Sequence, residues 1–390
     1  ALLIGAGEMG QLVGEHMLAA GLGYLAVTHP IEARADPLAR ALDCHRVTFD
    51  ALAEQMADPL YGAGLTYTDK PWHYELKRNM KARLVSSEFN TEFETDSRGR
   101  RGPTATDEPQ SIRILGLGDS FSMGFGVEQN DTYLSRLGSA IAQASSLSVD
   151  VTNGGVVGYA PGNSYHLLEG IIDEVRPDVV VFQLWVGDDL CLGAQAIRPV
   201  SLADVDNARR WRNLIRGSHI AMVLRDRIKG NETIRLWLMR RGYIQPFVTI
   251  QWLDRRFRDR CGGLDELSKL LQDTRELTDD RDIRLIVVLV PLLEQVDREA
   301  YHRALAYNGI AAPSDSVDFD APNQVMQNIA ARVGIDLLDV TEALRHSPNP
   351  SNSFFQRDPH LSSEGHRIVA EALARELTQE LIGARPGRED

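Results

Sequence analysis

A serine and a histidine that lie far apart in the chain have the residue types that nucleophilic catalysis requires. Ser120 follows Gly118-Asp119 at the end of the apolar run Ile112–Leu117, and His360 lies two residues after Asp358. A serine hydroxyl is a poor nucleophile unless a base takes its proton, and a histidine base works best when a carboxylate holds its tautomer. Ser120, His360 and Asp358 could therefore fill the three roles of a serine site that attacks a carbonyl carbon.

The elements around these residues are typical of an α/β protein with a parallel sheet. Largely apolar runs alternate with helical patterns from residue 111 onward, as expected for strands buried on both faces. Asn130-Asp131 offers an N-cap for a helix that contains Tyr133, and a final amphipathic helix begins near Ser362. The predicted strands are Ile112–Leu117, Val149–Thr152, Val179–Trp185, Leu285–Val290 and Ile335–Val340.

Four short blocks in the same part of the chain resemble those of the SGNH, or GDSL, hydrolases. They are Gly118–Val127, Asn153–Tyr159, Val186–Leu190 and Asp358–His366. Their order makes the resemblance specific, and it extends over about residues 60–385. The resemblance implies a flavodoxin-like, three-layer α/β hydrolase domain at 111–385. It also implies hydrolysis of carboxylic esters, lipase-like in kind, without a metal or an organic cofactor.

The resemblance also implies a role for each site residue. Ser120 is then the nucleophile and His360 the base, and Asp358 orients His360, although many members have their aspartate one position earlier, where this chain has Arg357. The expected oxyanion donors are the backbone N–H groups of Ser120 and Gly158 and an asparagine amide. The three further polar residues Asp119, Ser122 and His366 are expected to be structural.

The asparagine position of the oxyanion site holds Asp188 instead. An ionised carboxylate only accepts hydrogen bonds and repels a developing negative charge, so it could donate only if burial kept it protonated. The loss of one oxyanion donor typically costs about a hundred- to a thousandfold in turnover. We therefore expect Asp188 to reduce the efficiency of the site.

Three other functions stay open on the sequence alone. Ser120 could transfer an acyl or acetyl group to a carbohydrate, or deacetylate one, because water and a sugar hydroxyl attack the same intermediate. The chain could instead be a noncatalytic binding protein that keeps the SGNH fold but has lost its catalytic activity because of Asp188. An NADP-linked reductase is the third reading, and it rests only on a glycine-rich motif near the start of the chain.

The first 58 residues carry this glycine-rich turn between a strand-like run and a helical pattern. Gly5, Gly7 and Gly10 lie in the turn, and a second strand is expected over Tyr24–Val27. The order strand, glycine turn, helix and strand suits the binding of a dinucleotide pyrophosphate. The residues of the turn resemble those in the nucleotide-binding domain of glutamyl-tRNA reductase. The sequence predicts no further alternating strands and helices after this segment, and a dinucleotide site generally needs more of the sheet than two strands. We expect a partial Rossmann-like segment with weak or no cofactor binding.

Two further regions differ from the alternating pattern. Residues 59–110 are rich in turns and predict a small β-rich apron or linker, with alternation at 88–95. Residues 190–274 form a helical, Arg-rich insertion, in which 207–260 carry an excess of basic side chains among aromatic ones. This insertion could be a helical subdomain with solvated faces, or a rim that binds an anionic surface.

Composition limits the class of protein. The net charge of −13 argues against general binding of nucleic acid, so a small-molecule or carbohydrate ester is the expected partner. The three cysteines are few and far apart, which predicts no disulfide framework and a reducing compartment, and no Cys/His spacing suggests a metal site. No signal peptide or membrane-spanning run is visible, so we expect a cytoplasmic protein.

Overall fold

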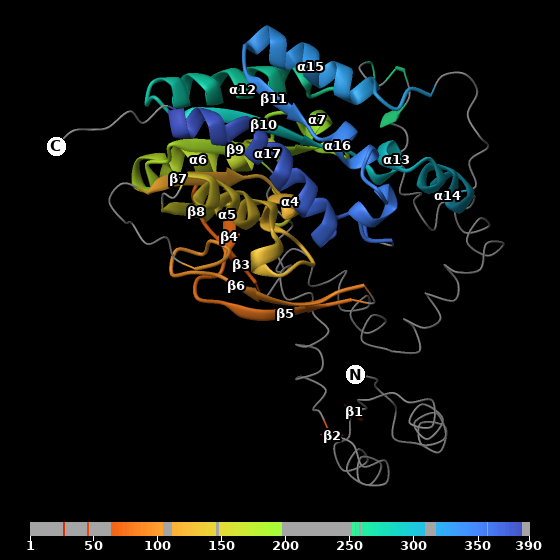
Figure 1. The fold of residues 1–390 in the computed structure, drawn as a ribbon, viewed down its shortest axis with the longest axis horizontal. Coiled ribbons are helices and arrows are strands. Elements are labelled where there is room, and N and C mark those ends of the chain that lie inside the picture. The colour runs from red at the N-terminus through yellow and green to blue at the C-terminus, as the bar shows by residue number, and fades with distance from the viewer. Residues whose placement is uncertain are drawn as a thin grey trace. The chain divides into compact units, whose positions relative to one another are not determined.

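A five-stranded parallel sheet lies at the centre of the α/β domain in the computed structural model (Figure 1). Its order is β11-β10-β9-β7-β8, which is the flavodoxin-like order when the strands are counted along the chain. Each predicted strand is present, with ends within one residue of those expected. The bounds are β7 Ile112–Leu117, β8 Val149–Asn153, β9 Val179–Trp185, β10 Arg284–Val290 and β11 Asp336–Asp339. The structure describes residues 26–27, 45–46, 64–86, 88–103, 111–145, 148–196, 252–253, 255–256, 259, 261–308, 317–356 and 358–383.

Helices cover both faces of this sheet and complete three layers (Figure 1). Helices α5 and α17 pack on each other, and α12 contacts both α6 and α15. β9 is buried along its whole length, which explains its unbroken apolar sequence. The longer helices are α5 Tyr133–Ser145, α6 Pro161–Val175, α12 Leu264–Asp279, α14 Arg298–Asn308, α15 Ala321–Val333 and α17 Ser363–Gly383. The short ones are α4 Ser120–Met123, η1 Gln129–Asp131, α7 Asp189–Leu192, α13 Leu293–Val296, α16 Thr341–Arg345 and η3 Pro350–Ser353.

The N-cap expected at Asn130-Asp131 is wrong. These residues form η1, and α5 begins after Thr132, whose Oγ1 accepts a hydrogen bond from the Ser135 backbone N–H at 3.2 Å. A threonine directly before the first helical residue satisfies a free N–H of the first turn, as an N-cap does.

Two antiparallel hairpins precede the sheet and form what we call the apron, residues 64–103. In the first, β3 Leu65–Tyr67 pairs with β4 Tyr74–Leu76, and in the second β5 Lys81–Val85 pairs with β6 Asn90–Glu94. Burial alternates along β6, which matches the period of two in its sequence. The apron contacts the sheet directly, because the Arg101 backbone N–H donates to the Asn153 carbonyl at 3.3 Å.

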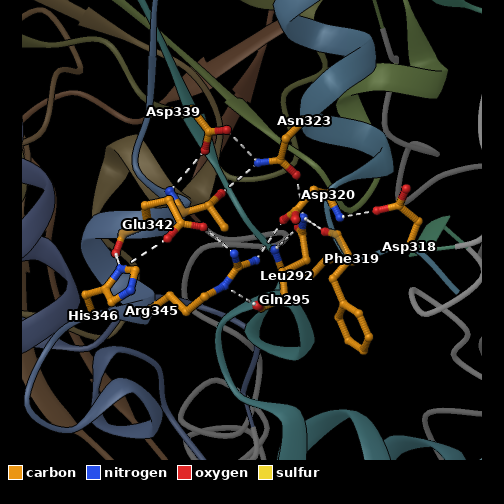
Figure 2. Close-up of polar contacts among 11 residues, drawn as sticks. Leu292, Gln295, Asp318, Phe319, Asp320, Asn323, Asp339, Glu342, Arg345 and His346 are labelled. Carbon is orange, nitrogen blue, oxygen red and sulfur yellow. Dashed lines mark hydrogen bonds and ion pairs between the residues drawn. The ribbon is translucent and has the colours of Figure 1, made fainter.

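A polar network fixes the segments that follow β10 and β11 (Figure 2). The Asn323 amide donates to Asp339 at 2.8 Å and to the Thr341 hydroxyl, and it accepts from the Gln295 amide. Arg345 then donates to the Gln295 carbonyl and to the Asp320 carboxylate. The network thus joins α13, α15 and α16 to one another and to the end of β11.

The chain divides into two compact units, residues 1–63 with 200–245, and residues 64–199 with 246–390. In the first unit, β1 Ala26–Val27 lies within the expected strand and pairs in parallel with β2 His45–Arg46, which was not expected. The glycine motif at 5–10 lies outside the described residues, and so does most of the Arg-rich stretch 207–260. Helix α12 starts at Leu264, inside the range expected for the insertion, and packs on α6 and β10.

Cys191 and Cys261 form a disulfide in the second unit, with their Cα atoms 4.6 Å apart. The sequence predicted no disulfide framework, and this single bond was not expected. Their separation of 70 positions in the sequence made the pair look distant, but Cys191 lies in α7 and Cys261 lies just before α12. In the part of the chain that the structure describes, no helix is both long and apolar enough to span a membrane.

Candidate active site

Ser120 is the first residue of α4 and comes shortly after strand β7, which lies between β9 and β8 in the sheet. Gly118 has φ +147° and approaches the buried Gln183 side chain so closely that a Cβ would lie 2.3 Å from its Oε1, so a glycine is needed here. The Asp119 carboxylate accepts from the Phe121 backbone N–H at 2.8 Å and caps the short helix. Asp119 therefore shapes the turn, as predicted, and Ser120 follows it with 8% of its surface exposed.

His360 and Asp358 come from the loop before α17 and meet Ser120 at the same edge of the sheet. His360 Nε2 lies 2.7 Å from Ser120 Oγ, and His360 Nδ1 lies 2.5 Å from Asp358 Oδ1. The Asp358 carboxylate also accepts from the His360 backbone N–H at 3.0 Å. The structure thus brings together the three residues that the sequence proposed, and a separation of two residues between Asp358 and His360 is sufficient for their contact.

The environment holds Asp358 ionised and His360 in place. Burial raises the pKa of Asp358, but the hydrogen bond and the charge of His360 outweigh it, so this pKa lies below its ordinary value. The His360 ring packs against Phe121 and Phe125, with centroids 4.9 and 4.7 Å away. An ionised carboxylate on Nδ1 directs the lone pair of Nε2 toward Ser120.

The second block, after β8, braces the serine loop. The Asn153 amide donates to the Ser122 carbonyl at 2.9 Å, and the Val156 backbone N–H donates to the Gly118 carbonyl at 3.2 Å. Gly158 is exposed in the same loop, and its φ of +74° is one that glycine adopts most easily. Gly158 thus belongs to a loop that is bonded to the one carrying Ser120.

The third block places two carboxyl groups, those of Asp188 and Asp189, close to the carboxyl group of Asp119 in the serine loop. Asp188 follows β9, the neighbour of β7, so it lies at the switch point where open α/β sheets bind ligands. Burial of its carboxyl group raises the pKa of Asp188 to about 6, although water still reaches the side chain. Burial, followed by the charge of Asp188, raises the pKa of Asp119 to about 7. Burial also raises the pKa of Asp189 well above its ordinary value, and the charges of Asp119 and Asp188 add to this effect.

The sequence comparison agrees with this geometry. A model of the GDSL-like lipase/acylhydrolase family matches residues 117–368, more than half of the chain. The chain belongs to this family. It is therefore an ester hydrolase of the SGNH type, as the four blocks predicted. No curated protein sequence matches the chain.

Solved structures of similar proteins include three esterases. A lipase/acylhydrolase from Enterococcus faecalis is 13% identical with a TM-score of 0.39, and it covers 69% of this chain and 96% of its own. The esterase EstA from Pseudoalteromonas sp. is 10% identical with a TM-score of 0.37, covering 70% and 99%. The acetylxylan esterase Axe2 from Geobacillus stearothermophilus is 16% identical with a TM-score of 0.37, covering 73% and 100%. None of these likenesses bears on the substrate of this GDSL-like hydrolase.

Arg101 is a residue of this GDSL-like hydrolase that sequence reasoning missed. Its guanidinium donates to the carbonyls of Met123 at 2.6 Å, of Gly124, and of Val127 at 2.5 Å. Burial lowers its pKa to about 10, although the Glu128 charge opposes the shift, so the group stays charged at neutral pH. Arg101 lies in a turn of arginines and glycines, which does not by itself predict burial. The one signal in the sequence was that this turn follows the alternating segment 88–95.

Two more buried polar residues support the serine loop. Gln183 Oε1 accepts from the Asp119 backbone N–H at 3.2 Å and from Ser122 Oγ at 3.1 Å. Gln183 is the one polar residue in the apolar strand β9, and this contrast is the signal by which its role could have been predicted from the sequence. His366 Nδ1 accepts from the Tyr133 backbone N–H at 3.2 Å, and burial lowers its pKa to about 3. The structural roles expected for Ser122 and His366 agree with these contacts.

Trp252, a residue of the Arg-rich stretch 207–260, contacts the loop that carries Asp188. Its indole Nε1–H donates to the Gly187 carbonyl at 2.6 Å, directly before Asp188. The adjacent Leu253 is buried and its carbonyl accepts from the Asp318 backbone N–H at 2.7 Å. This part of the insertion is therefore attached to the loop that carries Asp188.

Proposed function

We propose that the chain hydrolyses carboxylic esters through an acyl-enzyme on Ser120, with His360 as the general base and Asp358 as the residue that orients it. One observation carries the proposal: the unbroken sequence of contacts from Asp358 Oδ1 to His360 Nδ1 and from His360 Nε2 to Ser120 Oγ. The packing of the imidazole against Phe121 and Phe125 supports it, because a fixed ring keeps Nε2 within reach of the hydroxyl.

In this mechanism His360 moves one proton in each half of the reaction. Nε2 takes the hydroxyl proton while Ser120 Oγ attacks the ester carbonyl, and the same proton then passes to the leaving alcohol. A water molecule then loses its proton to Nε2 and attacks the acyl carbonyl. The bond to Ser120 Oγ breaks, the proton passes from Nε2 to Oγ, and the acid is released. Asp358 stays ionised throughout and stabilises the imidazolium, which agrees with its lowered pKa.

The oxyanion that forms in both halves needs donors near the Ser120 backbone. We assign this role to the backbone N–H groups of Ser120 and Gly158, which stand on two loops joined by the bond from Val156 to Gly118. Asp188 occupies the place of the third donor and can donate only in its protonated form. Because the pKa of Asp188 is raised to about 6, this form is a minority at neutral pH. We therefore infer a slow esterase rather than an inactive one.

The test is covalent labelling with a fluorophosphonate, followed by the intact mass of the protein. Such a probe reacts with a serine that a neighbouring base activates. We expect one adduct on the wild type and none on Ser120→Ala. Ser122→Ala is the matched control, because Ser122 Oγ is buried and bonded to the Leu117 carbonyl, so this variant should still be labelled.

The result that overturns the proposal is an adduct that persists in Ser120→Ala. If neither protein is labelled although both are folded, the chain is a binding protein with a disabled site. A short p-nitrophenyl ester gives the second readout, since turnover must fall with the loss of labelling.

A further inference from the structure

Three phenylalanine rings from distant parts of the chain gather beside His360. Phe89 lies directly before β6 in the apron, Phe125 follows α4, and Phe355 lies in the segment before His360. The centroid of the Phe89 ring lies 5.5 Å from that of Phe125 and 5.0 Å from that of Phe355. The Phe125 ring in turn packs on the His360 imidazole, with centroids 4.7 Å apart. We call these three residues the phenylalanine cluster.

Two of these rings rest on the backbone of the serine loop at Gly126. A Cβ at this position would lie 2.8 Å from a carbon of the Phe355 ring and 2.9 Å from one of the Phe89 ring, and Gly126 has φ +81°, so a glycine is needed here. The segments that carry the two rings are also bonded to each other, because the Glu88 carboxylate accepts from the Gln356 backbone N–H at 2.5 Å. The cluster is therefore held in place from both sides.

Of the two phenylalanine rings that pack on His360, only that of Phe125 has surface that a ligand can reach. Phe121 is 2% exposed and packs on the buried Trp185 ring. Phe125 is half-buried, as are the two other members of the cluster. His360 keeps 16% of its side-chain surface exposed. A ligand that reaches His360 can therefore place an apolar group on the Phe125 side of the imidazole.

The chemistry of ester cleavage decides which part of a substrate lies there. In the mechanism proposed above, His360 Nε2 gives its proton to the oxygen of the leaving alcohol. That oxygen must come within hydrogen-bond reach of Nε2, about 2.6–3.2 Å. The alcohol part of the ester consequently begins beside the His360 ring, and a few further carbon atoms bring it to Phe125. The acyl group carries no atom that His360 must bond.

We propose that the phenylalanine cluster binds the alcohol part of the ester, so that the chain prefers esters of apolar alcohols, and aromatic ones most. The inference rests on the esterase function proposed above. Each methylene group buried on the cluster should raise kcat/KM about fourfold. A phenyl group should gain more, because the Phe89 and Phe125 rings already meet edge to face and a third ring can pack on them in the same way. The apron thus contributes to specificity through Phe89.

Two isomeric esters test this inference on the full chain, with methyl acetate as the reference. Benzyl acetate carries its phenyl group on the alcohol, and methyl phenylacetate carries the same group on the acid, so the two have the same atoms. Release of acid in a pH-stat gives kcat/KM for each ester, divided by its rate of alkaline hydrolysis. We expect benzyl acetate to be cleaved about tenfold faster or more than methyl phenylacetate, because only its phenyl group reaches the cluster.

Variants then test whether the cluster causes the preference. Phe89→Ala should lower kcat/KM for benzyl acetate about tenfold and leave that for methyl acetate unchanged, because methanol has no group that reaches this ring. Tyr67→Ala is the matched control, since Tyr67 is an exposed aromatic residue of the other apron hairpin, and it should keep the preference. If Phe89→Ala does not fold, Phe89→Leu keeps an apolar side chain and removes the ring, and it should lower the preference about threefold.

Equal kcat/KM values for the two isomers, or a higher value for methyl phenylacetate, would overturn the assignment of the cluster to the alcohol. A folded Phe89 variant with the same preference as the wild type would overturn it too. In either case the fluorophosphonate still labels Ser120 and esters are still cleaved, so the esterase proposal stands. If Ser120 is not labelled and none of the three esters is cleaved, the esterase proposal fails and this one fails with it.

Discussion

The guanidinium of Arg101 donates to the Met123 backbone carbonyl across 2.6 Å, and Met123 is the last residue of the helix that Ser120 begins. Arg101 thus holds the far end of α4 from the apron side, while Gln183 holds its near end through Asp119. The apron is consequently part of the support of the serine loop and more than a linker before the hydrolase domain.

Replacing Arg101 should therefore slow the chemistry more than it weakens substrate binding. Lysine keeps the charge but presents one ammonium, which cannot bond the carbonyls of Met123, Gly124 and Val127 together as the planar fork does. We expect Arg101→Lys to lower kcat about tenfold with KM nearly unchanged, and to lower the free energy of unfolding by about 1–3 kcal/mol. Ester turnover and urea denaturation measure these two effects.

Arg83→Lys is the matched control for that variant, because Arg83 is an exposed apron residue that pairs with Glu92. Its activity and stability should stay close to those of the wild type. A rate of fluorophosphonate labelling in Arg101→Lys equal to that of the wild type would show that Arg101 does not position Ser120.

Asp188→Asn should raise esterase turnover, because it supplies an amide donor where the wild type has an acceptor. One oxyanion donor is worth about a hundred- to a thousandfold, which sets the upper limit of the gain. The pKa of Asp188 is raised to about 6, so the wild-type carboxyl is mostly protonated at pH 5 and mostly ionised at pH 8. The ratio of variant to wild-type kcat should therefore be larger at pH 8 than at pH 5.

Asp188→Ala separates two causes in that experiment. Alanine removes the negative charge without adding a donor, so a gain shared by both variants would come from relief of repulsion alone. A turnover of Asp188→Asn that is unchanged or lower across this pH range would contradict the idea of a weakened oxyanion position.

The sheet, and the three proposed catalytic residues that the structure brings together, could be predicted from the sequence, because both depend on local signals. Buried parallel strands appear as unbroken apolar runs, and the predicted ranges of β7 and β9 agree with the structure from end to end. Ser120 and His360 lie in short blocks whose order is specific to the family. The approach of their side chains over 240 positions then follows from the fold, since both loops stand at one edge of the sheet.

The supports of the site could not be predicted, because they depend on contacts between distant segments. Arg101 reads as part of a polar turn until the apron folds against α4. Cys191 and Cys261 looked unrelated because they are 70 positions apart in the sequence, whereas their Cα atoms lie 4.6 Å apart in the structure. Asp189 has no distinguishing signal within its block, and its burial beside Asp119 is a property of packing.

The buried carboxyl groups should make the protein less stable as the pH rises. Asp119 and Asp189 have folded-state pKa values raised above the ordinary 3.8, so the folded state binds more protons than the unfolded one above about pH 4. The contribution of these two groups to the free energy of unfolding is fully present below that pH. It is lost as the pH rises through their folded-state pKa values, and the pKa of Asp119 is about 7. Asp189→Asn removes one such group and keeps an acceptor for the Trp185 N–H.

We therefore expect Asp189→Asn to have a higher Tm than the wild type at pH 8, by about 3 °C or more, because the variant no longer buries a negative charge. The difference should shrink toward pH 4.5. Asp173→Asn is the control, since Asp173 is exposed, pairs with Arg281 and has a lowered pKa. An Asp189→Asn protein with the same Tm difference at both pH values would show that the charge of Asp189 is not the cause.

The Cys191–Cys261 disulfide should be detectable by counting thiols. It joins α7, which begins directly after Asp188, to the start of α12 across 70 residues, and such a loop closure is worth roughly 4 kcal/mol in the unfolded-state model. Alkylation of the denatured, unreduced protein should therefore modify one of the three cysteines, Cys44, and alkylation after reduction should modify all three. Cys261→Ser should lower the Tm, whereas Cys44→Ser should leave the disulfide intact. Three alkylated cysteines before reduction would mean that the pair is reduced in the isolated protein and that the loop of Asp188 is held by packing alone.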